Sequence, residues 1–598
     1  MIENTKQIKI LDIDNLPTYL EKRNCYSELI DFANSDNGKK GQICALYGLR
    51  RTGKTVLSYQ LAKELKQKGY KTLYLSCSDE LANINQDLKN NEKHTPEITE
   101  LFNILDSAIK EKYEYVFIDE VTFIKDFVGQ GNVLANYYSN QGLSIIVTGT
   151  DSLSFALESY DDMYDRIKMV HTSYVPFEEY NRLLGKDIDE YIEQGGTLAK
   201  ESPFKEGSKR IEYTNTAIVN NIIHSISNSE YKNKNAITLF YEEDDIRTVI
   251  QRCINQMNQK FLAKAITKNN GIYESAPLHT GLSNMSKYPY ATHLDIPEID
   301  KQIKIILDVL NKDEMKTQFK QEDVDVIRDS LKELDLILTM PQYELVNGEL
   351  SQKEELQIIC QAGMIYCHAK ELLNILVNDK NWINLEKCGL ERKNEFISRI
   401  DNQVKGDILE NLILYDTFQA LSDQYYVTKI NTRIKNRDKE IDVAIIDKKN
   451  LDTYLFEVKY SSEIAENQHQ HLSSPEFLDY ISDNFGQIKG RFVIYNGKTD
   501  IVTDELSSYF GNIDYIPASN YLKEVTHCSN IMELINSFNQ KHIDYVPPKP
   551  TSGLGQVPDS IVGAIQKKKQ NIKGLKSSVE EIITEEKERV QYSFESGR

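Results

Sequence analysis

Residues 48–55, GLRRTGKT, have the spacing G-x-x-x-x-G-K-[ST] of a loop that binds nucleotide phosphates. In such a loop, backbone N–H groups around Gly48 and Gly53 surround the phosphates, aided by the positive end of the following helix. The ammonium group of Lys54 would neutralise the β- and γ-phosphates, and the hydroxyl of Thr55 would ligate Mg²⁺. The pattern therefore predicts a binding site for ATP and Mg²⁺.

The surroundings of this loop favour the same interpretation. The apolar run QICALYG precedes it, and TVLSYQLAKELKQKG follows with apolar residues at helical spacing. Arg51 and Thr52 lie inside the loop and are expected to line the nucleotide site. The alternative is a glycine-rich turn with Lys54 exposed, which the strand before and the helix after disfavour.

A second acidic motif, YVFIDEV, places Asp119 and Glu120 at the carboxyl end of an apolar strand. We expect Asp119 to hold Mg²⁺ through water and Glu120 to orient or deprotonate the attacking water. Two acids that merely cap a strand end are the alternative for an isolated pair. Together with the phosphate loop, the pair predicts ATP hydrolysis as well as binding.

Two further positions could sense the γ-phosphate. In LSIIVTGT, Thr148 and Thr150 lie where a strand next to the Asp119 strand would end. Arg166, in YDDMYDRIKMV, could reach a phosphate of its own or a neighbouring subunit. A surface arginine without a role in the site is the alternative for Arg166.

The carboxyl-terminal part carries a second set of chemical residues: Glu410 on a predicted helix, Asp442 in KEIDVAI, and Glu457 with Lys459 in LFEVKYS. Asp442 and Glu457, at the ends of adjacent strands, could hold Mg²⁺ or Mn²⁺ beside a scissile phosphate, with Glu410 completing the metal shell. Lys459 shares a face with Glu457 because side chains alternate along a strand, and it could orient water or steady developing charge. The arrangement resembles the PD-(D/E)xK nuclease core.

The E-x-K pattern is common on exposed strands, so its neighbours give it meaning. Phe456 and Val458 are apolar and flank Glu457, which indicates a buried strand. Related domains can keep this fold while acting only as binding modules, so catalysis is a separate hypothesis from the fold. DNA is the predicted partner, and a basic stretch that leads to Asp442 could bind it. The members of this stretch are Lys429, Arg433, Lys435, Arg437 and Lys439. A solvated charged face is the alternative for these residues.

The elements that must position these residues alternate from Gln42 onward. Apolar strand-like runs separated by helical stretches predict an α/β fold with a parallel sheet wound by helices on both faces. Its ligand is expected at the carboxyl ends of the strands. The run LPTYLEKRNCYSELIDFAN predicts an entry helix, and EDVDVIRDSLKELDLILTMPQYEL predicts a helix and wing. A second alternation after Lys405 predicts a smaller α/β domain.

In order, the segments GLRRTGKT, FIDEV, VTGTDS, PFEEY and YIEQGGTL resemble the archaeal-type AAA-like ATPases of bacteria and archaea. The similarity covers most of residues 28–500. It implies an ATPase domain, a helical and winged-helix region and a restriction-endonuclease-like domain in one chain. By analogy it also implies a homo-oligomer, because such ATPases usually build their site between subunits.

These patterns divide the 598 residues into several domains, as such a length requires. We expect a helical entry segment (1–40), an ATPase domain (41–185), a helical lid with a winged-helix-like region (186–395), a nuclease-like domain (396–545) and a charged flexible tail (546–598). The tail follows the linker PPKPTSGLGQVPDS and could dock a protein partner.

Composition limits the class of protein. The eight cysteines form no CxxC pair, and no apolar stretch is long enough to cross a membrane, so a cytoplasmic protein without membrane contact is expected. The net charge of −20 weakens the case for nucleic acid, although only the charge near a binding groove matters.

Three functions remain open at this point. The leading hypothesis is an ATPase coupled to a metal-dependent DNA nuclease, in defence or mobile-element control. The second is an ATP-driven switch whose distal domain binds nucleic acid or protein without cutting. The third is a regulatory scaffold that docks a partner through its tail.

Overall fold

The computed structural model divides the chain into two compact units. The N-terminal unit comprises residues 1–340 and 356–416, and the C-terminal unit comprises 341–355 and 417–598. The structure describes residues 8–49, 51–77, 96–121, 124, 127, 132–149, 166–172, 174–198, 332, 336–346, 349–366, 370, 389–435, 437–465 and 468–539.

A six-stranded sheet in the order β1-β3-β4-β5-β2-β6 forms the centre of the N-terminal unit. Strands β2 to β6 run parallel, and β1 pairs antiparallel with β3 at the edge. The strands are β1 (Lys9–Leu11), β2 (Ile43–Tyr47), β3 (Thr72–Ser76), β4 (Tyr115–Asp119), β5 (Ser144–Gly149) and β6 (Ile167–His171). The predicted parallel α/β sheet is therefore confirmed.

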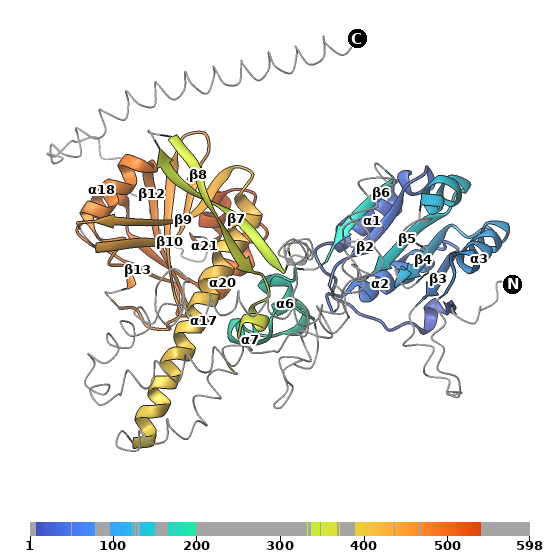
Figure 1. Cartoon of the computed structure of the whole chain (residues 1–598), viewed down its shortest axis with the longest axis horizontal. Helices are drawn as coiled ribbons and strands as arrows, with labels where there is room; N and C mark the ends of the chain where they lie inside the picture. The colour runs from blue at the N-terminus through green and yellow to red at the C-terminus, as the bar shows by residue number, and fades with distance from the viewer. Residues whose placement is uncertain are drawn as a thin grey trace, which may run out of the picture. The chain divides into compact units, whose positions relative to one another are not determined.

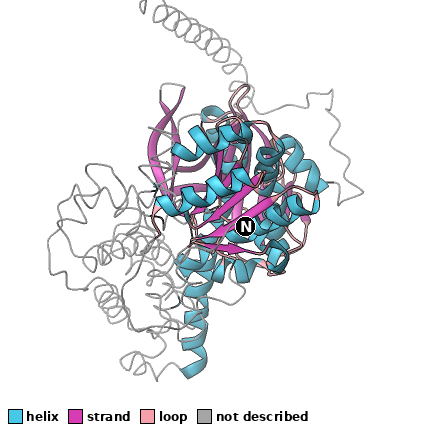
Figure 2. Ribbon diagram, turned by 90° about the vertical axis from the view of Figure 1, so that its right-hand side faces the viewer, coloured by secondary structure: helices cyan, strands magenta, loops and turns pink. Residues whose placement is uncertain are grey.

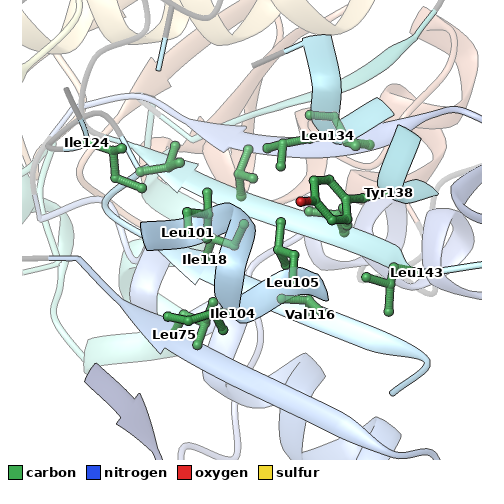
Figure 3. Packing of buried hydrophobic residues seen from close by; sticks show 14 of the residues in the cluster. Leu75, Leu101, Ile104, Leu105, Val116, Ile118, Ile124, Leu134, Tyr138 and Leu143 are labelled. Carbon is green, nitrogen blue, oxygen red and sulfur yellow. The ribbon is translucent and has the colours of Figure 1, made fainter. Parts of the chain in front are cut away.

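Helices cover both faces of this sheet (Figure 1). On one face, α1 (Tyr26–Asn34) and α2 (Lys54–Gln67) pack against the strands. On the other face lie α3 (Ile98–Lys110) and the π-helical turn η5 (Leu134–Tyr138). Figure 3 shows leucines of α3 above residues of β4, within a cluster that is fully buried apart from its rim. The apolar runs of the four inner strands β2, β3, β4 and β5 are buried on both sides, as a parallel sheet requires, whereas the edge strands β1 and β6 are mostly half-buried.

The entry segment differs from its prediction. Residues 17–23 form no helix, and only Tyr26–Asn34 is helical, after the short 3-10 turn η1 (Ile13–Asn15). The carbonyl oxygens of Tyr19 and Glu21 accept hydrogen bonds from the Gln60 side chain of α2, so this backbone is bound to α2 instead of forming a helix of its own. The segment also contains β1, which pairs with β3, so it belongs to the N-terminal sheet and is not a separate helical element.

After β6 the chain forms two short helices, α6 (Phe177–Leu184) and α7 (Ile188–Gln194). The predicted lid, the tail and most of the predicted recognition helix lie outside the described residues. A hairpin of β7 (Ile337–Val346) and β8 (Glu349–Ile359) follows at the place of the expected wing. A winged-helix fold therefore stays a prediction.

The C-terminal unit contains a second six-stranded sheet in the order β13-β14-β12-β11-β10-β9. The strands β9, β10 and β11 pair antiparallel, whereas β11, β12 and β14 run parallel. Their bounds are β9 (Tyr425–Ile434), β10 (Arg437–Asp447), β11 (Asp452–Lys459), β12 (Gln487–Tyr495), β13 (Asp500–Val502) and β14 (Ile513–Pro517). The predicted strands of this domain are thus present, on a mixed sheet.

Helices also flank this second sheet. Helix α18 (Pro475–Asn484) contributes to the core on one face. On the other face lie α20 (Ala518–Val525), whose Tyr521 packs edge-on against Phe456, and α21 (Ile531–Asn539), whose Phe538 stacks on Tyr521. The long helix α17 (Gly389–Leu421) precedes β9 and is prominent in two views (Figure 1, Figure 2). Among the described helices, none is long and apolar enough to cross a membrane.

Candidate functional site

The phosphate loop joins the end of β2 to the start of α2. Gly48, with φ +134°, and Gly53, with φ +94°, occupy left-handed backbone conformations that favour glycine. Gly53 is also the N-cap of α2, and a Cβ there would lie 3.2 Å from a methyl group of Leu198. Arg51 is exposed and has φ +65°, an uncommon conformation for a side-chain-bearing residue. The tight turn therefore depends on both glycines of the motif.

Lys54 lies folded against this loop. Its side chain is buried, and its ammonium group donates hydrogen bonds to the carbonyl oxygens of Gly48 at 2.9 Å and Leu49 at 2.6 Å. The Thr52 hydroxyl donates to the Leu49 carbonyl at 2.7 Å and shares a hydrogen bond with the Thr172 hydroxyl at 2.9 Å. The loop thus holds a buried cation beside the expected position of the phosphates, which excludes the exposed-lysine alternative.

The strand-end acid Asp119 meets the loop helix. Its Oδ1 accepts a hydrogen bond from the Thr55 hydroxyl at 3.3 Å and another from the Thr148 hydroxyl. Strand β5, which carries Thr148, lies between β2 and β4 and pairs with both, so three predicted residues converge at one sheet edge. Burial raises the pKa of Asp119, against the hydrogen bonds from Thr148 and Thr55. A hydroxyl beside a carboxylate is a suitable oxygen donor pair for Mg²⁺.

Glu120 turns away from the regular strand immediately after Asp119. Its φ of +57° is a strained conformation for a residue with a side chain, and such strain clusters at functional sites. The backbone N–H of Glu120 donates to the Thr148 hydroxyl at 3.0 Å. Thr148 therefore accepts from one acidic residue and donates to the other, and it fixes their relative position.

Arg166 lies away from this edge, which corrects one expectation. It is exposed and precedes β6, and its carbonyl accepts from the N–H of Ile43 at the start of β2. Because β2 and β6 are parallel, this is the amino end of the strands, whereas the phosphate loop follows the carboxyl end. Arg166 therefore does not serve the ATP site of its own chain; a role in a neighbouring subunit stays a prediction. Thr150 lies outside the described residues.

The C-terminal unit brings three of its predicted residues together. The ammonium group of Lys459 lies 3.1 Å from Oδ2 of Asp442 and 2.6 Å from Oε2 of Glu457. The backbone N–H of Val458 also donates to Oδ2 of Asp442, at 2.7 Å. Phe456 and both carboxylates are buried, so the predicted buried strand is confirmed.

Charges within this cluster push the two acids in opposite directions. Burial opposes ionisation of Asp442, but the charges of Lys459 and Lys429 outweigh it and lower its pKa. For Glu457, burial and the nearby charge of Asp442 raise the pKa. Burial also opposes protonation of Lys459, yet the two carboxylates raise its pKa, so it is a cation at neutral pH. Divergent pKa values on neighbouring acids are typical of catalytic sites.

Three further residues complete this cluster, and the motifs did not identify their role. Nδ1 of His471 lies 3.1 Å from Oε1 of Glu457 and 2.8 Å from the Glu440 carbonyl oxygen. Carboxylate oxygens of Glu440 and Asp442 lie within 4.8 Å of each other. Lys429 is buried, which excludes the solvated-face alternative for this residue, whereas Arg433 is exposed, as that alternative expects. The hard oxygen donors suit Mg²⁺ or Mn²⁺.

Glu410 lies on α17 and is half-buried. Helix α17 continues from the N-terminal unit into the C-terminal unit at Thr417, and Glu410 lies in the portion of the helix that belongs to the N-terminal unit. Its assignment as a metal ligand stays a prediction.

Comparison with known proteins identifies the nucleotide-binding part. A profile of the family described as AAA domain matches residues 40–181. Residues 40–181 form an AAA domain. The profile covers the phosphate loop, Asp119 and Thr148, so the AAA domain contains the complete cluster described above.

The search of curated proteins found no match. Among solved structures, the Hsp104-ADP complex of S. cerevisiae is 14% identical, with a TM-score of 0.24 and 54% of each chain covered. AMPPCP-bound DnaA from Aquifex aeolicus is 17% identical, with a TM-score of 0.23 and 55% of this chain and 98% of that chain covered. Aeropyrum pernix ORC1 in complex with DNA is 13% identical, with a TM-score of 0.22 and 62% and 100% covered.

Proposed function

We propose that this protein hydrolyses ATP at its AAA domain and that the nucleotide state controls a metal-dependent DNA nuclease site in the C-terminal unit. The observation that carries the proposal is the convergence of Asp442, Glu457 and Lys459 on neighbouring strands, in a chain that also has a complete phosphate loop. Buried carboxylates held by a lysine are costly to place together, and such costs are typical of active sites.

In the ATP site, Thr55 and Asp119 would hold Mg²⁺, which supplies positive charge to the β- and γ-phosphate oxygens when bound. Lys54 would exchange its two loop carbonyls for phosphate oxygens. Glu120 would accept the proton of the attacking water, with its backbone fixed by Thr148. These residues would therefore bind the phosphates and Mg²⁺ and deprotonate the attacking water at one edge of the sheet.

In the acidic cluster, Asp442, Glu457 and Glu440 would hold Mg²⁺ or Mn²⁺, which supplies Lewis acidity to a phosphodiester when bound. Lys459 enters the reaction as a cation, so its role would be to stabilise negative charge on the phosphate and not to remove a proton. His471 would keep Glu457 oriented through its Nδ1. The fold of this unit, three antiparallel strands continued by parallel ones, supports the restriction-endonuclease-like assignment.

One observation favours a second candidate. Lys459 already pairs with both carboxylates, so the cluster can be satisfied without a metal. In that case the C-terminal unit would be a catalytically inactive module that binds nucleic acid or protein, and the protein would be an ATP-driven switch. The predicted homo-oligomer and a protein partner of the tail are compatible with either function.

The test is cleavage of circular and linear DNA by the full chain with Mg²⁺ or Mn²⁺. The variants are Lys459→Ala and, as a matched control, Lys489→Ala. Lys489 also pairs with an aspartate of the same sheet, at 3.4 Å from Asp452, but near the opposite end of β11. We expect metal-dependent cutting that Lys459→Ala abolishes and Lys489→Ala retains. ATP hydrolysis without any cutting would favour the switch instead.

A further inference from the structure

Arg23 is a buried cation outside every motif of the sequence. It precedes α1 and is 6% exposed, although arginine is almost never buried without a partner. Its Nη1 donates to the carbonyl oxygens of Thr52 at 2.8 Å and Thr172 at 2.7 Å. Its Nη2 donates to the Tyr174 carbonyl at 2.6 Å, and its Nε donates to Oε2 of Glu179 at 2.6 Å. Glu179 is equally buried and supplies the compensating charge.

These contacts join three separate parts of the AAA domain. Thr52 is the residue of the phosphate loop immediately before Gly53, Thr172 follows β6, and Glu179 lies on α6. The aliphatic stem of Arg23 also approaches the loop, because a Cβ on Gly53 would lie 3.4 Å from its Cδ. The backbone of the loop is therefore held from outside by one side chain.

The chemistry of this contact requires arginine. A guanidinium presents five N–H donors in a rigid planar fork, whereas a lysine ammonium is one point with three donors on a flexible stem. Four acceptors spread over three parts of the chain can be reached by the planar guanidinium of an arginine but not by the single ammonium of a lysine. Since Arg23 is occupied by carbonyls and Glu179, it acts on the loop backbone and not on a phosphate.

We propose that Arg23 and Glu179 are positioning residues of the ATP site, which hold the carbonyl of Thr52 so that the following N–H groups face the phosphates. This inference rests on the ATPase part of the proposed function. An ordered loop binds phosphates without first paying the entropy of ordering it, so loss of the clamp weakens nucleotide binding.

The experiment compares Arg23→Lys with Arg182→Lys in the full chain. Arg182 is a matched control because it also joins α6 to the segment before α1. It donates hydrogen bonds to the Lys22 carbonyl, to the side chain of Asn24 and to the carboxylate of Glu178. Within the described part of the chain, the hydrogen bonds and ion pairs of Arg182 go to residues outside the phosphate loop. Both variants keep the positive charge, so only the geometry of the donors changes.

We expect Arg23→Lys to raise the KM for ATP and the dissociation constant of ADP by about tenfold or more, which corresponds to about 1.4 kcal/mol. Arg182→Lys should leave both values within about twofold of wild type. If Arg23→Lys does not fold, Glu179→Gln carries the test; it keeps an acceptor for Nε but removes the charge, and a rise of about threefold or more is expected.

Two results would overturn the inference. One is an active wild type whose KM and ADP affinity are unchanged in Arg23→Lys or, where that does not fold, in Glu179→Gln. The other is an equal loss in Arg182→Lys, which would assign the effect to docking of the entry segment in general. A wild type that does not hydrolyse ATP but binds ADP would contradict the proposed ATPase while leaving the ADP-affinity comparison decisive for Arg23.

Discussion

The hydroxyl of Tyr174 donates a hydrogen bond to Oδ1 of Asp416, 242 residues further along the chain. Asp416 lies on α17 and is buried, and its burial raises its pKa to about 7 against the effect of this hydrogen bond. The carbonyl of the same tyrosine accepts from Arg23. Tyr174 therefore connects the residue that clamps the phosphate loop with the helix that continues into the C-terminal unit.

This connection predicts the effect of Tyr174→Phe. The variant keeps the aromatic ring, whose centroid lies 4.5 Å from that of Tyr415 in an edge-on arrangement. It also keeps the backbone carbonyl that accepts a hydrogen bond from Arg23. It leaves Asp416 buried without this donor, at a cost of about 1–3 kcal/mol. We expect near-normal ATP hydrolysis but loss of ATP stimulation of DNA cleavage. Tyr137→Phe, an exposed tyrosine of the same unit, is the control; full stimulation in Tyr174→Phe would exclude this route.

Thr148→Val tests the hydroxyl that links Asp119 and Glu120. The substitution keeps the size of the side chain, but it removes a donor to Asp119 and an acceptor for the N–H of Glu120. We expect kcat for ATP to fall by about ten- to a hundredfold, because the general base loses its fixed position. Thr72→Val, near the start of β3, should have little effect. Steady-state kinetics at saturating Mg²⁺ measure both, and an equal kcat in the two variants would contradict the role of Thr148.

The acidic cluster predicts opposite effects of its members on metal affinity. Lys459 competes with a divalent cation for Asp442 and Glu457, so Lys459→Ala should bind Mn²⁺ more tightly than wild type while losing cleavage. Asp442→Asn should bind Mn²⁺ at least about tenfold more weakly, because it removes a charged oxygen ligand. Titration calorimetry of the full chain in the absence of ATP measures the Mn²⁺ affinity of each protein. Weaker Mn²⁺ binding by Lys459→Ala would show that the lysine supports the metal site instead of competing with it.

An ion pair outside both sites, between the buried Arg491 and the half-buried Asp504, contributes to the acid stability of the C-terminal unit. Arg491 is fully buried and donates to Oδ1 of Asp504 at 2.8 Å and to Oδ2 at 2.9 Å. Burial opposes ionisation of Asp504, but Arg491 outweighs it and holds the pKa of the carboxyl well below its usual range. The pair therefore stabilises the fold above the ordinary aspartate pKa of about 3.9 and loses that contribution as pH falls further.

Asp504→Asn should accordingly destabilise this unit by about 3–5 kcal/mol at neutral pH, because Arg491 stays buried without its counter-charge. The difference from wild type should shrink as pH falls below about 3.9 and be clearly smaller at about pH 3, where Asp504 is mostly protonated in the unfolded chain. Thermal unfolding midpoints of both proteins at the two pH values measure this. A difference that is independent of pH would mean that the ion pair contributes through packing alone.

Local patterns predicted the parts of the fold and site that depend on neighbours in sequence. The phosphate loop, the strand ending at Asp119 and the strand of Glu457 and Lys459 each combine a motif with a strand or helix beside it. The phosphate loop and Asp119 lie at the carboxyl ends of strands of the first sheet, and Glu457 and Lys459 lie at the carboxyl end of β11 in the second sheet, where strand polarity predicts such motifs. The apolar spacing predicts an entry helix that is too long, because the hydrogen bonds from Gln60 to the carbonyls of Tyr19 and Glu21 are tertiary contacts that the local sequence does not show.

Other residues were out of reach because their role arises from distant contacts. Arg23 meets Glu179 across 156 residues, and nothing around it forms a pattern. His471 lies in a turn region after β11, where a histidine carries no local signal. Lys429 belongs to a charged stretch, and only its burial, at a register shift between β9 and β10, shows that it faces inward. A charge that the fold buries cannot be recognised from one sequence by its type alone.

The most direct test of the account is the initial rate of DNA cleavage by the full chain with Mn²⁺, with and without ATP, compared between wild type and Lys54→Ala. The account predicts that ATP raises the wild-type rate by about tenfold or more and leaves the Lys54→Ala rate unchanged, because that variant cannot bind the phosphates. Cleavage at one rate in all four conditions would contradict control by the AAA domain. Hydrolysis of ATP with no cleavage in any condition would contradict the nuclease itself.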